Sequence, residues 1–355
     1  MEKDRIEQHN APGLRACVLA VAALLMASML ADCSGGGTVG SGFTLTPPPP
    51  CRSCVAAEYL VPGATFLGGV TAGSDGNLWF TGVTGSTGMI GRITTAGAVT
   101  EYSLGGAEPE AIVAGPGGEL SFTGTGPPRS APFFAGFRPG LIGEITTAGA
   151  VTWIGAFPTT KLGGIAVGLD GNVWCTEKDA NKIGRITAGI VTEFAIPTAG
   201  SSPSGIAAGP DGNLWFTEIQ GNKIGRITTA GAITEFAIPT ASSGPSGIGA
   251  GPDGNLWFTE LASNGIGRIT TAGVVTEFAI PTAGSVPEYI VAGHDGNLWF
   301  TEFSGNNIGK ITTAGAISEY ALATAHSYPF GIAAGSDGNL YFTEFYSNKI
   351  GKFRL

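Results

Sequence analysis

The sequence predicts an all-β protein, a seven-bladed β-propeller of four-stranded blades whose last blade is closed by the N-terminal strand. Three observations support this fold class. Gly accounts for 59 of the 355 residues, which penalises helix interiors throughout the chain. A motif of the form Asp-Gly-Asn-Leu-Trp recurs seven times, and a repeat of about 40 residues has the length of a propeller blade. Within each repeat, short apolar runs alternate with Asp-Gly and Ala-Gly turns, a pattern typical of antiparallel hairpins.

The motif or its remnant begins at Asp75, Gly117, Asp170, Asp211, Asp253, Asp295 and Asp337. The fourth repeat shows the predicted strands most clearly, at residues 205–208, 213–218, 223–228 and 233–239. Its first strand consists of small residues, as expected for the strand nearest the propeller axis. Its second strand carries Trp215, and we expect the aromatic residue that recurs at this position to pack blade against blade.

The last repeat ends at Leu355 without a fourth strand, and the N-terminal segment EYLVP (residues 58–62) is similar to the missing one. We therefore expect this segment to complete the last blade, with Glu58 opposite Lys352, because ring closure removes exposed sheet edges. Opposite charges are also expected to face each other across the third and fourth strands of each repeat. The expected pairs are Arg92 with Glu101, Arg226 with Glu235, Arg268 with Glu277 and Lys310 with Glu319.

The residues before the repeats predict an exported protein. Residues 1–33 resemble a signal peptide of the lipoprotein type, with Cys33 as the lipidated residue. An ordinary cleaved signal or an uncleaved anchor is the alternative. Residues 34–56 form a Gly-, Ser- and Pro-rich tether, in which Cys51 and Cys54 are expected to form a local disulfide. The propeller then covers residues 57–355, and we expect it outside the cytoplasm, in the bacterial cell envelope or secreted.

Charge and motifs exclude several functions. The net charge of −9 provides no basic surface for a phosphate backbone, so no nucleic-acid partner is expected. A membrane contact is expected only through the N-terminal anchor, and we expect a monomer. The sequence contains no nucleophile elbow, no HExxH motif and no phosphate-binding Gly-Lys-Ser/Thr loop.

The repeat units resemble those of the streptogramin B lyase (virginiamycin B lyase) family. The similarity lies in runs such as SGIAAGPDGNLWFTE (residues 204–218), GNKIGRIT (221–228) and ITEFAIP (233–239), and it covers roughly residues 57–355. The resemblance implies a seven-bladed propeller that opens a cyclic depsipeptide at its ester by elimination. It also implies assistance by Mg²⁺ and makes magnesium the one expected cofactor.

The same resemblance implies a set of site residues. The family's base is a His between Pro and Gly-Ile at the start of the last repeat, where this chain has Phe330. Tyr328 replaces an acid of the family, and a second His falls on Glu288. Glu344 lies about one position from the family's acidic residue. Catalysis here would therefore depend on Glu288, Glu344 or a relocated base, His326, in the loop before the last repeat.

Recurrent carboxylates predict an acidic face. The second strand ends in Thr-Glu in five repeats, at Glu177, Glu218, Glu260, Glu302 and Glu344. Because antiparallel strands alternate in direction, these ends share a face with the loops that hold Glu110 and Glu288. Oxygen ligands suit Mg²⁺, so Glu302 and Glu344 are candidate metal ligands. The alternative is a consensus that caps strand ends and solubilises the rim.

Candidate ligand-binding residues lie on the same face. They are Glu110, Tyr289, Tyr328 and Phe330, together with Phe133, Phe134 and Phe137 of an expanded loop at residues 126–140. Such insertions are often confined to a binding face, so this loop is expected to act as a lid or docking loop. The alternative is an insertion that only covers its own aromatic residues.

These observations predict a propeller that binds a small or peptidic ligand at its acidic loop face without the family's His-dependent lyase activity. One alternative is a Mg²⁺-dependent carbon–oxygen lyase that linearises streptogramin B-type cyclic depsipeptides. A second is a structural scaffold of the cell envelope. The residues alone leave open whether the protein is an enzyme, because propellers host all three classes of function.

Overall fold

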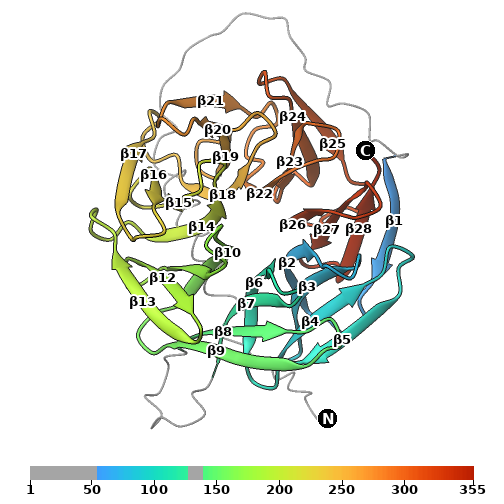
Figure 1. Ribbon diagram of the computed structural model, residues 1–355. Helices are drawn as coiled ribbons and strands as arrows, with labels where there is room; N and C mark the ends of the chain where they lie inside the picture. Colours follow the sequence, from blue (N-terminus) through green and yellow to red (C-terminus); the bar gives the residue numbers. More distant parts are fainter. Residues whose placement is uncertain (1–53, 127–138) are drawn as a thin grey trace, which may run out of the picture. The chain divides into compact units, whose positions relative to one another are not determined.

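The computed structural model describes residues 54–126 and 139–355, which form seven four-stranded antiparallel sheets around a common axis (Figure 1). The chain divides into two units, and all described residues belong to the second, Pro48–Leu355. The prediction of a seven-bladed β-propeller is confirmed. No helix long and apolar enough to cross a bilayer is present in this described part of the chain.

Each sheet is one blade, numbered here in chain order from the blade that contains β2. The inner strands are β2 (Phe66–Ala72), β6 (Glu108–Ala114), β10 (Leu162–Val167), β14 (Pro203–Ala208), β18 (Pro245–Ala250), β22 (Pro287–Ala292) and β26 (Pro329–Ala334). The second strands are β3 (Leu78–Thr84), β7 (Leu120–Thr125), β11 (Val173–Glu177), β15 (Leu214–Glu218), β19 (Leu256–Glu260), β23 (Leu298–Glu302) and β27 (Leu340–Glu344). The third strands are β4 (Thr87–Ile93), β8 (Gly140–Ile145), β12 (Lys182–Thr187), β16 (Lys223–Ile227), β20 (Gly265–Ile269), β24 (Asn307–Ile311) and β28 (Lys349–Phe353). The outer strands are β5 (Val99–Ser103), β9 (Val151–Phe157), β13 (Ile190–Ala195), β17 (Ile233–Ala237), β21 (Val275–Ala279), β25 (Ile317–Ala321) and β1 (Val55–Leu60).

The N-terminal strand β1 pairs with β28 and completes blade seven, as predicted. It begins at Val55, two residues before the expected start of the propeller. The expected pairing of Glu58 with Lys352 is wrong by one residue, because Glu58 lies opposite Gly351. The Glu58 carboxylate instead accepts a hydrogen bond from Lys349 Nζ at 2.6 Å, whereas Lys352 pairs with Asp337 at 2.7 Å.

The expected register of the third and outer strands is also wrong by one residue. Arg226 lies opposite Thr234, and Glu235 lies opposite Gly225. The reason is the length of the turn. Five residues lie between the paired Ile227 and Ile233, so the turn is centred on one residue, whereas the expected pairing requires a centre between two residues.

The same register holds in the other three blades for which a charge pair was expected. The basic residues lie opposite hydroxyl residues, at Arg92 with Thr100, Arg268 with Thr276 and Lys310 with Ser318. The Arg226 guanidinium lies 5.6 Å from the ring centres of both Trp215 and Phe236, a cation–π arrangement. The basic residues therefore pack on aromatic rings rather than facing the predicted acids.

The blades pack through their second strands. Trp215 is fully buried, and its indole N–H donates to Asp211 Oδ1 at 3.0 Å, which ties the recurrent Trp to the recurrent Asp-Gly turn. Phe216 is also fully buried and lies against Gly225, where an added Cβ would overlap the ring. The repeat therefore combines an aromatic residue with a Gly on adjacent strands. Trp215 also packs in one apolar cluster with Leu256 and Phe258 of the next blade, so the blade-to-blade packing expected for the Trp is confirmed.

A threonine in every second strand links neighbouring blades around the axis. Thr217 Oγ1 accepts a hydrogen bond from Gly205 N–H in its own blade and donates to the Ser246 carbonyl in the next blade, at 2.9 and 2.6 Å. The same donation to the next inner strand is made by Thr81, Thr123, Thr176, Thr259, Thr301 and Thr343. Thr343 donates to the Gly68 carbonyl of blade one, which completes the ring. These links hold one inner-strand residue of each blade at a defined place around the axis.

Candidate functional site

The residues held by the threonine links form what we call the axial ring, with one residue from each blade. Its members are Gly68, Glu110, Gly163, Ser204, Ser246, Glu288 and Phe330. They lie near the start of the inner strands, on the side of the loops that join second to third strands, which we call the loop side. The backbone carbonyls of these seven residues occupy equivalent positions in their blades. The blades therefore differ at the axial ring only in the side chains that they contribute.

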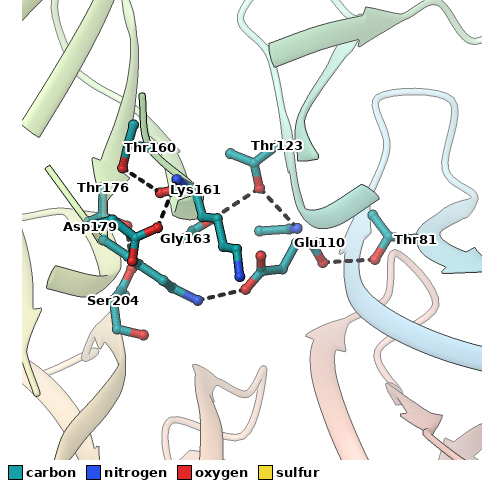
Figure 2. Close-up of polar contacts among 12 residues, drawn as sticks. Thr81, Glu110, Thr123, Thr160, Lys161, Gly163, Thr176, Asp179 and Ser204 are labelled. Carbon is teal, nitrogen blue, oxygen red and sulfur yellow. Dashed lines mark hydrogen bonds and ion pairs between the residues drawn. The ribbon is translucent and has the colours of Figure 1, made fainter. Parts of the chain in front are cut away.

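One half of the axial ring carries an ion pair between blades two and three. Lys178, which follows β11, extends its ammonium group to Glu110 Oε1 at 2.7 Å. Figure 2 shows the Glu110 carbonyl accepting from the Thr81 hydroxyl, and Thr123 Oγ1 accepts from the N–H of the next residue, Ala111. A Cβ on Gly163 would lie 2.7 Å from Lys178 Cε. Gly163 therefore leaves the space through which Lys178 reaches Glu110.

Glu288 belongs to the axial ring on blade six, and the Lys178 ammonium group of this ion pair acts on its carboxyl group. Burial raises the pKa of its carboxyl group to about 7, although the Lys178 ammonium acts in the opposite direction. Its backbone carbonyl accepts a hydrogen bond from Thr259 Oγ1 at 2.9 Å. The pKa of the neighbouring Tyr289 is also raised, by burial first and then by the Glu110 carboxylate. Glu288 is therefore a carboxyl group that titrates near neutral pH.

The other half of the axial ring is aromatic. Phe330 packs against Tyr289, Phe345 and Phe303, with ring centres 5.0, 5.5 and 6.2 Å apart. The cluster continues through Tyr328, whose ring centre lies 5.1 Å from that of Phe303. We call this group, drawn from blades one, six and seven, the aromatic cluster. Its members are Phe66, Tyr289, Phe303, Tyr328, Phe330, Phe345 and Tyr346.

The cluster has a buried base and a partly exposed surface. Phe303 and Phe345 are almost completely buried. Tyr289, Tyr328 and Phe330 are half-buried, and Tyr346 is 45% exposed. The structure thus brings together Glu110, Glu288, Tyr289, Tyr328 and Phe330, all of which the sequence proposed for the loop face.

His326, the predicted relocated base, is exposed and lies 6.1 Å from Tyr328 between ring centres. Its backbone has φ 55°, and that of Tyr328 has φ 52°, a conformation uncommon for residues other than Gly. This loop conformation brings the imidazole to the edge of the aromatic cluster.

The strand-end glutamates do not lie on the rim. Glu177, Glu218, Glu260, Glu302 and Glu344 are at most 1% exposed. The alternative interpretation, in which they solubilise the rim, is therefore wrong, and they do not make the loop face acidic. Its candidate acids at the axis are Glu110 and Glu288.

Each buried strand-end glutamate is close to the acid on the outer strand of its own blade. Burial and then the Glu235 carboxylate raise the pKa of Glu218 to about 8. Burial likewise raises the pKa of Glu344 to about 7, with Glu58 adding to the effect. In blades three, four and seven, a lysine pairs with the outer acid, at Lys182, Lys223 and Lys349. Gly265 and Asn307 replace it in blades five and six.

The candidate metal ligands do not form a metal site in this arrangement. Glu302 accepts a hydrogen bond from Asn307 Nδ2 at 2.8 Å, and Glu344 lies in the next blade beside Glu58. Within residues 54–126 and 139–355, no three His, Cys, Asp or Glu side chains are grouped so that they could hold a metal ion. The residues present therefore do not fit Mg²⁺, and magnesium stays a prediction of the resemblance.

Several predicted positions lie outside the described residues, namely Cys33, Cys51, Phe133, Phe134 and Phe137. Cys54 is described and is disulfide-bonded. Cys175, in contrast, is a buried free thiol.

Sequence reasoning missed Lys178, Phe303, Phe345, Tyr346 and Phe66. A signal for the first three was present, because they occupy the same position directly after the strand-end Glu. Ile219 and Leu261 hold this position in blades four and five. Aligning the repeats at this position would have shown one lysine among apolar residues.

The fold and the axial ring define a seven-bladed propeller with a mixed aromatic and charged loop side. The family model that matches the chain is that of the virginiamycin B lyase family, over residues 125–250 and 164–355. A comparison with curated protein sequences finds no match.

Solved structures of this family are similar over most of the chain. A streptogramin B lyase structure is 36% identical, has a TM-score of 0.75 and covers 84% of this chain and 97% of its own. The virginiamycin B lyase from Staphylococcus aureus is 40% identical, with a TM-score of 0.75 and coverage of 84% and 98%. A catalytically inactive His-to-Ala variant of that lyase with quinupristin is 39% identical, with a TM-score of 0.74 and coverage of 84% and 98%. The chain belongs to the virginiamycin B lyase family.

Proposed function

We propose that this family member is exported and binds a small or peptidic ligand on the loop side of the propeller axis, without the family's His-dependent lyase activity. The observation that carries the proposal is the surroundings of Phe330. This residue holds the position that the resemblance assigns to the catalytic His, and its ring packs against Tyr289, Phe303 and Phe345. A benzyl side chain cannot accept a proton, so the abstraction step of an elimination has no base at this place.

The loop side nevertheless has the properties of a binding surface. Partly exposed aromatic rings provide apolar contact area at low entropic cost, and Glu110, Lys178 and Glu288 add charge at a few places. This combination of apolar walls and few polar groups is typical of sites for small ligands. The solved relative with quinupristin supports a depsipeptide as the first ligand to test.

Export is supported by Cys54, because a disulfide persists in an oxidising compartment. The signal peptide and the lipidated Cys33 remain part of the same proposal. Mass spectrometry of the membrane fraction would test them, since a lipidated mature form begins at Cys33.

A second candidate function is supported by Glu288. Its pKa of about 7 would let it accept a proton near neutral pH. An elimination would then transfer the α-proton to Glu288, break the carbon–oxygen bond of the ester and release a carboxylate. This candidate retains lyase activity with a different base.

One experiment distinguishes the two candidates. Quinupristin is incubated with the purified protein with and without Mg²⁺; binding is followed by calorimetry, and the ring-opened product by chromatography with fragmentation mass spectrometry. Fragmentation is required because elimination leaves the mass of the opened ring unchanged. We expect binding without ring opening. If the unmodified protein linearises quinupristin and the Glu288→Gln variant does not, the proposal of binding without lyase activity is refuted and the proposal of Glu288 as the base is established.

Leu169→Ala is the matched control, because Leu169 is 76% exposed in the turn between β10 and β11, at the opposite ends of these strands from the axial ring. Phe330→His restores the residue that the resemblance places there. Absence of quinupristin binding by both the unmodified protein and the control would refute a depsipeptide ligand.

A further inference from the structure

We propose that the loop side of the axis binds an alkylammonium group, a tertiary or quaternary amine carried by the ligand, between the rings of Tyr289 and Phe330 and the carboxylate of Glu288. This inference rests on the proposed ligand-binding function and adds the chemical class of the ligand. It follows from the placement of the rings, the distribution of charge and the poor fit to a metal ion.

The rings of Tyr289 and Phe330 form a corner. Their centres are 5.0 Å apart and their planes meet at 65°, so the two rings are not stacked face to face. Both residues are half-buried. A cation within about 6 Å of a ring centre is attracted by the negative face of the ring. Recognition of alkylated ammonium groups by several rings uses this attraction.

The buried part of the aromatic cluster holds this corner in place. The buried rings of Phe345 and Phe303 pack against Phe330, and Phe303 also contacts Tyr328. Tyr328 thereby extends the partly exposed aromatic surface beyond the corner. A supported wall of this kind is preorganised, so little side-chain entropy is lost when a ligand binds.

The charges of the axial ring favour a cation. Lys178 is paired with Glu110 at 2.7 Å and its ammonium group also acts on Glu288, so these three side chains together carry one excess negative charge when Glu288 is ionised. The threonine links hold the backbone carbonyls of Glu288 and Phe330 at neighbouring places in the axial ring. The remaining members of the ring carry no charge. One carboxylate is therefore left to face a ligand cation.

An alkylammonium fits these groups better than a metal ion does. Mg²⁺ and Ca²⁺ take oxygen ligands, and the described residues contain no group of three His, Cys, Asp or Glu side chains that could hold a metal ion. Alkylated amines are large and weakly hydrated, so aromatic rings replace their water at low cost. The combination of one carboxylate and several rings selects for this kind of cation.

Binding of benzyltrimethylammonium to the purified protein tests the inference, with benzyl alcohol as the neutral aromatic comparison. We expect calorimetry or ligand-observed NMR at pH 8 to show the cation binding at least tenfold more tightly than the alcohol. Glu288→Gln and Phe330→Leu should each weaken the cation about tenfold, whereas Leu169→Ala should bind as the unmodified protein does. Equal binding of both probes, or a Glu288→Gln variant with unchanged affinity, would overturn the inference.

The affinity should also fall at acid pH, because protonation of Glu288 removes the anion. The titratable and charged groups near Glu288 are Lys178, Glu110 and Tyr289, with Tyr328 and His326 in the loop before β26. Glu288→Gln should abolish the pH dependence between pH 6 and pH 8, and His326→Gln should leave it in place. Melting temperatures of all variants show whether a loss of binding reflects unfolding, and Tyr328→Leu is a second ring variant should Phe330→Leu be unfolded.

Quinupristin binding in the same samples separates this inference from the proposed function. If quinupristin binds but the cation shows no preference over benzyl alcohol, only the ammonium inference fails. If neither quinupristin nor the cation binds, both fail.

Discussion

Replacing the buried Glu218 with Gln should stabilise the protein at alkaline pH and leave its stability at pH 5 nearly unchanged. The Glu218 side chain is fully buried, and neither of its carboxyl oxygens has a hydrogen-bond partner. Burial, followed by the nearby Glu235 carboxylate, raises its pKa from 4.5 to about 8. A Gln side chain has nearly the same shape and carries no charge at any of these pH values.

The sign follows from proton linkage. Between pH 4.5 and pH 8 the folded chain holds a proton on Glu218 that the unfolded chain releases, so the free energy of unfolding decreases as the pH rises through this window. Each pKa unit corresponds to about 1.4 kcal/mol, which sets an upper limit of about 3 kcal/mol lost by pH 7. Structural relaxation reduces this value, and we expect Glu218→Gln to gain roughly 1–3 kcal/mol at pH 8.

Urea denaturation at pH 5, 6, 7 and 8 measures the effect as a difference in slope against pH. Glu235→Gln is the matched control in the same blade. Burial acts to raise the pKa of Glu235, but hydrogen bonds from Thr198 and Lys223 outweigh it and lower the pKa. That variant should therefore lose stability at pH 8. Identical pH slopes for Glu218→Gln and the unmodified protein would refute the assignment of a raised pKa to Glu218.

Three further predictions concern the fold. Thr217→Val removes a hydroxyl that accepts from Gly205 N–H and donates to the Ser246 carbonyl. Thermal unfolding should show a loss of about 1–3 kcal/mol because both partly buried backbone groups become unpaired; a cost no larger than that of a surface substitution would contradict the role of the threonine links. Gly225→Ala places a methyl group on the Phe216 ring and should cost more than about 1 kcal/mol, measured by the denaturant midpoint; an unchanged midpoint would contradict the close contact between this Gly and the ring. Glu58→Gln breaks the ion pair that holds β1 to Lys349 and should increase hydrogen exchange in β1 before the other blades; uniform exchange across all blades would show that this pair does not secure the closure.

The repeat pattern was sufficient to predict the blades because it is a local property. A strand of small residues, an Asp-Gly turn, an aromatic strand and a second turn recur with one period, and each element makes its contacts within its own blade or the next. The predicted strands of blade four agree with the observed ones to within two residues at every end. The closing strand was predictable for the same reason, since residues 58–62 repeat the sequence of the outer strands.

The register was not predictable from charge. The opposite charges of Arg226 and Glu235 favour pairing them, but the turn length decides which residues face each other. A register shift of one residue moves every side chain of the strand to the other face of the sheet. The glutamates at the strand ends were misjudged for a related reason. Their positions in the sequence are typical of an exposed rim, whereas in the folded protein they are at most 1% exposed.

The sequence by itself determined the fold class, the number of blades, the closure of the ring and the family, because these depend on periodic signals that each repeat carries independently. Only the tertiary structure decided what the axial ring contains. Glu110 and Lys178 come from the consecutive blades two and three, Glu288 comes from blade six, and the aromatic cluster combines residues of blades one, six and seven. The physical reason is that repeat contacts link neighbours along the chain, whereas contacts at the axis depend on the closure of the whole ring.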